Sequence, residues 1–251
     1  MRRDERFTVD GHVQVEIELT AGSVTIRTSE SGTVQVSADT NGSAELDISQ
    51  MGDTIAVRQG RRSRSARVVL DVPVGTDVSV KGASVGVSAR GALGSLRTKT
   101  ASGDVDAEDV VRLDLSMSSG DARIGVVRDE ASITTASGDA VVRSVGGRLQ
   151  ATLASGDLRA ESVAGDIEAG TAAGDVVIGR CDGSVVAIRT VSGDIHIGLP
   201  GGIRVDPEIS TMSGKVRLPD AAPVADPSVE RRPVRLRLRT VSGDIRVDRA
   251  R

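Results

Sequence analysis

Apolar and polar residues alternate along most of this chain, in short stretches separated by glycine. From residue 102 onward the stretches flank a repeated triplet, Ser-Gly-Asp, with the variants Ala-Gly-Asp at 173–175 and Ser-Gly-Lys at 213–215. Alternation with a period of two is typical of β-strands. The central glycines are spaced by 17, 18, 18, 18, 19, 21 and 29 residues, and such a period indicates one structural unit that is copied and stacked. They are Gly103, Gly120, Gly138, Gly156, Gly174, Gly193, Gly214 and Gly243.

Each repeat contains two candidate strands. Apolar residues lie two and four positions after the glycine, as in Leu158 and Ala160, and this holds in every repeat through Val216 and Leu218 to Ile245. A second alternating stretch precedes the glycine, and between residues 138 and 183 a glycine falls at every ninth position. We therefore expect an all-β protein, a parallel β-solenoid of the β-helix or β-roll kind, with coils of about 18 residues that bury the apolar positions.

The triplet itself is predicted to form a corner of each coil. Glycine adopts positive φ at little cost, and Ser and Asp side chains bond nearby backbone groups in turns, so the eight glycines are expected to be structural turns. The acids would then form a column at one corner. Turn N–H donors or bound cations could relieve their repulsion, but one acid per corner gives few oxygens for calcium, and we expect turn chemistry and no metal site. The column comprises Asp104, Asp121, Asp139, Asp157, Asp175 and Asp194.

Two regions differ in pattern. Residues 1–81 alternate but lack the triplet, and we expect a β-rich cap or an irregular start of the solenoid. Residues 82–251 form the repeat solenoid, with a proline-containing surface loop near 219–233 before the last strands. At the other end we expect charge on the terminal edge, which discourages open-ended stacking but does not forbid a dimer; the residues are Arg246, Asp248, Arg249 and Arg251.

The amino-acid composition narrows the range of binding partners that we expect. Phe7 is the single aromatic residue, which suits a thin interior and disfavours sites that grip sugars or bases by stacking. A net charge of −3, from 32 basic and 35 acidic residues, gives no clear sign of nucleic-acid binding. We expect a protein partner or self-association. The candidate interaction patch consists of two basic clusters, Arg61, Arg62 and Arg64, and Arg235, Arg237 and Arg239.

The sequence contains no arrangement that predicts catalysis or a cofactor. Gly82 to Gly86 matches G-x-S-x-G, but that nucleophile motif needs a following helix, and the pattern here is that of a strand. His12 and His196 have no partner at a metal or triad spacing, and we expect both to face solvent. Without an apolar leader or an 18-residue apolar run, and with Cys181 alone, we expect a cytoplasmic protein with no membrane span and a buried thiol.

The motifs together are those of a known family. Val-Pro-Val-Gly at 72–75, successive Thr-x-Ser-Gly-Asp units and the final stretch from Arg239 to Val247 resemble the bacterial DUF4097 family of β-strand-repeat proteins, whose members are commonly labelled adhesins. The resemblance implies the solenoid architecture and brings no catalytic residues. The first hypothesis is a non-enzymatic scaffold. The alternatives are an exported surface adhesin and a polysaccharide-acting β-helix enzyme.

Overall fold

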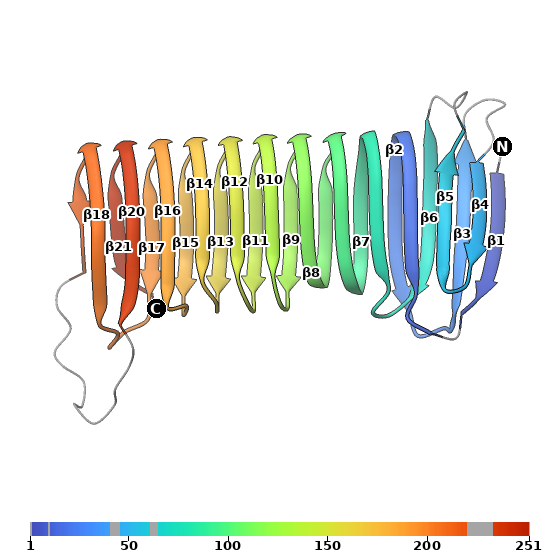
Figure 1. Ribbon diagram of the computed structural model, residues 1–251, viewed down its shortest axis with the longest axis horizontal. Helices are drawn as coiled ribbons and strands as arrows, with labels where there is room; N and C mark the ends of the chain where they lie inside the picture. The colour runs from blue at the N-terminus through green and yellow to red at the C-terminus, as the bar shows by residue number, and fades with distance from the viewer. Residues whose placement is uncertain (1, 10, 41–45, 61–64, 220–232, 251) are drawn as a thin grey trace. The chain divides into compact units, whose positions relative to one another are not determined.

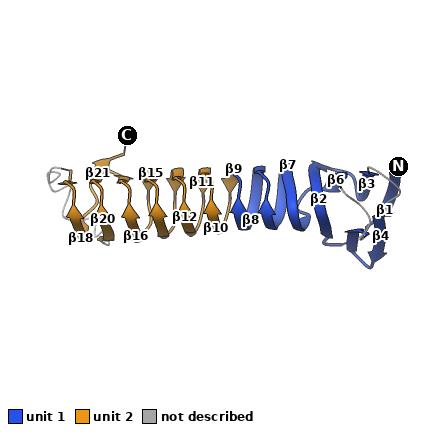
Figure 2. Ribbon diagram, turned by 90° about the horizontal axis from the view of Figure 1, so that it is seen from above, with its two compact units in different colours: residues 1–125 blue, residues 126–251 orange. Residues whose placement is uncertain are grey.

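The computed structural model describes residues 2–9, 11–40, 46–60, 65–219 and 233–250. All regular elements in these ranges are β-strands. The chain divides into two compact units, residues 1–125 and 126–251 (Figure 2). The division expected at residue 81 stays a prediction. Most of the loop expected near 219–233 lies outside the described residues.

The described residues of unit 1 form eight complete strands, and β9 (Ala122–Val127) spans the boundary between the units. The eight are β1 (Arg2–Thr8), β2 (Gln14–Ser29), β3 (Thr33–Thr40), β4 (Leu46–Met51), β5 (Thr54–Gln59), β6 (Ala66–Pro73), β7 (Asp77–Ser102) and β8 (Val105–Ser119). Unit 2 contains β10 (Ala131–Ser137), β11 (Ala140–Val145), β12 (Leu149–Ser155), β13 (Leu158–Val163), β14 (Ile167–Ala173), β15 (Val176–Cys181), β16 (Val185–Ser192), β17 (Ile195–Leu199), β18 (Val205–Ser213), β19 (Val216–Arg217), β20 (Val234–Ser242) and β21 (Ile245–Arg249).

Unit 1 combines parallel coils with antiparallel pairs. The long strand β2 pairs in parallel with β7 and also with β5 and β6, and β7 pairs in parallel with β8. By contrast, β1 pairs antiparallel with β3, β3 with β6, and β4 with β5. The region without the triplet therefore contains both a coil-like parallel arrangement and an antiparallel sheet.

Unit 2 is built from parallel two-strand coils. Strand β12 pairs with β10 and β14, β13 pairs with β11 and β15, and Leu149 lies opposite Ile167, 18 residues later. Side chains alternate inward and outward along each strand, and Leu149, Leu158 and Ile167 are at most 1% exposed. Successive coils thus stack identical positions over one another, and the prediction of an all-β parallel solenoid is confirmed.

The last coils depart from chain order. Strand β20 pairs in parallel with both β16 and β18, and β21 pairs with both β17 and β19 (Figure 1). The final coil therefore lies between two earlier ones, and the expectation that Arg246 and Asp248 of β21 occupy the terminal edge is wrong. That place belongs to β18 and β19. The physical reason is visible in the sequence of β18, because Pro207 lacks a backbone N–H and suits an edge strand better than a central one.

Candidate functional site

The glycines of the triplets form one corner column within each unit. All eight have positive φ, between +116° and +155°. They also touch the neighbouring coil: a Cβ on Gly156 would lie 2.2 Å from the carbonyl oxygen of Gly138, and one on Gly174 would lie 2.1 Å from that of Gly156. Glycine is needed at this corner both for its backbone conformation and for the close approach of the next coil.

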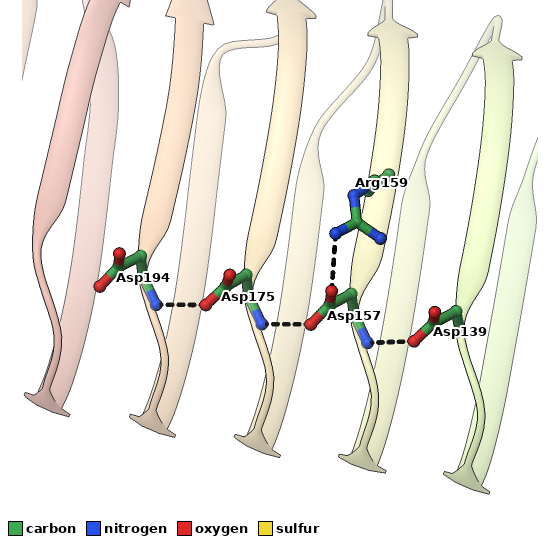
Figure 3. Close-up of polar contacts among 5 residues, drawn as sticks. All are labelled: Asp139, Asp157, Arg159, Asp175 and Asp194. Carbon is green, nitrogen blue, oxygen red and sulfur yellow. Dashed lines mark hydrogen bonds and ion pairs between the residues drawn. The ribbon is translucent and has the colours of Figure 1, made fainter.

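The aspartates beside these glycines cap one another's backbone (Figure 3). The N–H of Asp157 donates to Oδ1 of Asp139 at 2.9 Å, and the N–H of Asp175 donates to Oδ1 of Asp157 at 2.8 Å. The series continues with the N–H of Asp194, which donates to Oδ1 of Asp175 at 2.8 Å, and the N–H of Asp244, which donates to Oδ1 of Asp194 at 2.7 Å. It ends with the N–H of Lys215, which donates to Oδ1 of Asp244 at 2.8 Å. In unit 1 the N–H of Asp121 donates to Asp104 at 3.0 Å. We call this arrangement the aspartate ladder.

Arginines compensate part of the ladder's charge. The guanidinium of Arg159 lies 2.7 Å from Oδ2 of Asp157, and that of Arg123 lies 2.9 Å from Oδ2 of Asp121. The carboxylate of Asp157 thus bonds the backbone N–H of Asp175 through Oδ1 and the guanidinium of Arg159 through Oδ2. Within the described ranges no group of three or more His, Cys, Asp or Glu residues could hold a metal ion. The arrangement is suited to fixing the register of the coils.

A column of threonines lines the interior next to this corner. The hydroxyl of Thr135 donates to the carbonyl of Ser137 at 3.2 Å, and that of Thr240 donates to Gly193 at 3.3 Å. The hydroxyls of Thr98, Thr171 and Thr190 are also buried, but they have no hydrogen-bond partner among the residues that the structure describes. An unsatisfied buried hydroxyl costs stability, so the column is only partly adapted to its interior position.

The basic cluster of β20 lies on the outer face and is partly neutralised. Nε of Arg235 lies 4.0 Å from Oδ2 of Asp206, and Nε of Arg237 lies 3.5 Å from Oε2 of Glu208. The guanidinium of Arg239 also contacts Glu208. The hydrogen bond from Arg239 lowers the pKa of Glu208. The sequence could not reveal these pairs because it does not show that β18 lies beside β20. The other cluster, Arg61, Arg62 and Arg64, lies outside the described residues.

Both histidines have carboxylate partners, which sequence spacing did not reveal. Nε2 of His12 lies 2.7 Å from Oδ2 of Asp77, and Nε2 of His196 lies 2.8 Å from Oδ2 of Asp248. Their side chains remain 66% and 44% exposed. Burial acts to raise the pKa of Asp77, but hydrogen bonds from His12 and Ser95 leave that pKa lower than usual. These pairs join segments 65 and 52 residues apart, so only the fold brings them together.

The remaining candidates for chemistry occupy ordinary structural positions. Cys181 is fully buried, as expected, and desolvation raises the pKa of its thiol to about 11. Such a thiol is a poor nucleophile near neutral pH. The stretch from Gly82 to Gly86 lies inside β7 and is followed by more strand, so it lacks the helix that a nucleophile elbow requires.

Parallel coils with glycine corners and an aspartate ladder define a repeat protein of the β-solenoid class. The chain belongs to the Toastrack DUF4097 family, whose model matches residues 12–248. No curated protein has a matching sequence. In the described part of the chain, no helix is long and apolar enough to span a bilayer.

Two solved structures have a similar course of the chain. One is a "putative adhesin" from Bacteroides fragilis, with 13% identity and a TM-score of 0.47, covering 98% of this chain and 97% of that chain. Another is a "putative lipid binding protein" from Parabacteroides distasonis, with 12% identity and a TM-score of 0.47, covering 98% of this chain and 96% of that chain. At these identities and TM-scores, the names of these proteins do not bear on the function of this chain.

Proposed function

We propose that the protein is a non-enzymatic scaffold that presents the regular outer face of its coils to a protein partner or to another copy of itself. The observation that carries this proposal is the aspartate ladder. Its acids recur at the same place in successive repeats, and they bond the backbone of the neighbouring coil. Because these carboxylates hold neighbouring coils in register, we assign them a structural role. The outward side chains of the strands are then the groups that would contact a partner.

A pulldown from native cells tests the proposal, with the full chain as bait. We expect a protein that still binds when both components are purified, and that binds Arg237→Glu more weakly than wild type. Arg143→Glu, at an exposed arginine on the outer face of β11, is the matched comparison. Binding that only Arg237→Glu weakens would place the contact near β20, and equal weakening by both changes would extend it over the outer rows. Turnover of a glycan by the purified protein, abolished by replacing one particular acid, would overturn the proposal in favour of the enzyme.

We also propose a cytoplasmic location, in keeping with the single cysteine of the chain. A protein with one buried thiol gains nothing from an oxidising compartment, where small secreted domains rely on disulfides. Cell fractionation with an antibody to the folded chain tests this. Recovery of the protein at the cell surface would favour the alternative, an adhesin that is exported by a route not visible in the sequence.

A further inference from the structure

The outermost coil of unit 2, formed by β18 and β19, exposes a layer that every inner coil buries. Its inward positions in the repeat are Pro207, Ile209, Thr211, Val216 and Leu218; together with Val205, which lies opposite buried Val234 of β20, we call them the end layer. Val216 and Leu218 are 43% and 49% exposed, whereas Ile245 and Val247 at the same positions of the neighbouring coil are at most 1% exposed. The expectation that the repeat buries Val216 and Leu218 is therefore wrong, because β18 and β19 have a strand neighbour on one side only among the described strands.

The end layer has the shape and chemistry of a stacking surface. Val205, Pro207, Ile209 and Thr211 lie opposite residues of β20 whose side chains are at most 4% exposed. Among the residues that the structure describes, the same row of side chains is thus packed against β20 on one side and has no strand on the other. Apolar surface of this kind is stabilised by burial, and an exposed apolar patch with a polar rim marks a contact site.

The rim of the end layer carries charges of opposite sign on its two strands. The outer face of β18, the outermost strand on that side, bears Asp206 and Glu208, which also pair with the arginines of β20 behind them. The β19 side bears Lys215 and Arg217. A two-fold arrangement that sets β18 of one copy beside β19 of a second copy would bring acids next to bases twice, once on each side. Such a patch is complementary to itself, which is the requirement for an isologous interface.

We propose that the end layer binds the end layer of a second copy and forms a closed dimer. The inference goes beyond the proposed scaffold function, because it adds a contact between two copies at the end of unit 2 to the contacts proposed for the outer face. Pro207 offers no N–H for a continuous ladder along β18, so side-chain packing and the charged rims hold the contact. Because the same patch serves both copies, the assembly closes at two and does not grow into a filament.

Sedimentation equilibrium of the full chain over a wide concentration range tests the dimer. We expect a monomer–dimer equilibrium that Leu218→Glu weakens by roughly tenfold or more, since it places a charge in an apolar contact. Val141→Glu replaces another exposed aliphatic residue, on β11 and away from the end layer, and should leave the equilibrium unchanged. Thermal unfolding of each variant shows that its fold is intact.

Cross-linking tests the proposed orientation. Asp206→Cys and Arg217→Cys variants are mixed and treated with a short bismaleimide, while buried Cys181 stays unreactive. We expect the mixed pair to cross-link more than either variant alone. A monomer at all concentrations, a dimer insensitive to Leu218→Glu, or equal cross-linking of all pairs would overturn the inference. None of these results affects the scaffold function, which fails only on the pulldown and glycan assays.

Discussion

The carboxylate of Asp157 accepts a hydrogen bond from the backbone N–H of Asp175, at 2.8 Å, across adjacent coils of unit 2. The acceptor belongs to one coil and the donor to the next, so the bond fixes their relative register at the corner. Repetition of the contact turns a column of like charges, which would repel in isolation, into a series of charge-assisted hydrogen bonds. The ladder gives the recurring aspartate of Ser-Gly-Asp a structural role.

Removal of one ladder acceptor should destabilise the protein more than removal of its charge. We expect Asp157→Ala to lower the free energy of unfolding by about 1 to 2 kcal/mol, because the N–H of Asp175 loses its acceptor. Asp157→Asn keeps an acceptor oxygen and should retain most of the stability. Urea denaturation of both variants measures the difference. Equal losses would mean that charge, including the pair with Arg159, is what matters.

The corner glycine should tolerate no side chain. A Cβ on Gly156 would lie 2.2 Å from the carbonyl oxygen of Gly138, at a φ of +126°, and we expect Gly156→Ala to cost at least about 2 kcal/mol. At Gly170 the nearest atom to a built Cβ is 3.8 Å away, so Gly170→Ala should be neutral or slightly stabilising. Thermal and urea unfolding compare the two. Coincident melts would contradict the steric argument.

Replacement by valine should change the stability of the protein in opposite directions at two of the buried threonines. The hydroxyl of Thr190 is buried without a partner among the described residues, so Thr190→Val should raise stability by up to about 1 kcal/mol. Thr135 donates to the carbonyl of Ser137, and Thr135→Val should lower stability by about 1 kcal/mol. Unfolding midpoints in urea test the pair. Destabilisation by both changes would show that the Thr190 hydroxyl has a bonding role.

Stability should fall in acid partly through Asp77. Its carboxylate accepts the N–H of Ser95 at 2.6 Å and contacts His12, and its folded-state pKa lies below the ordinary 3.8. The unfolded chain therefore takes up this proton first as the pH falls, so the contribution of Asp77 is present above about pH 4 and is lost through the folded pKa. Urea midpoints between about pH 5 and 2.5 should decline less steeply in Asp77→Asn than in wild type. Parallel profiles would exclude this role.

The inward positions and the corner of each coil could be predicted because the same residue pattern recurs in every repeat. The parity of Leu158 and Ala160 marks them as inward, and the recurring glycine marks a corner. The presence of Asp after that glycine indicates turn chemistry. Its acceptor role across coils, however, depends on the distance from Asp157 to Asp175, which no single repeat contains.

The sequence by itself determined the coil length, the inward positions and the corner, because these follow from residue periodicity and backbone sterics. Only the tertiary structure decided which coils are neighbours. Each Thr-x-Ser-Gly-Asp unit offers nearly the same strands, so the repeat pattern alone does not distinguish stacking in chain order from insertion of β20 between β16 and β18. Long-range packing resolves this equivalence, and with it the pairs His196–Asp248 and Arg237–Glu208 and the exposure of the end layer.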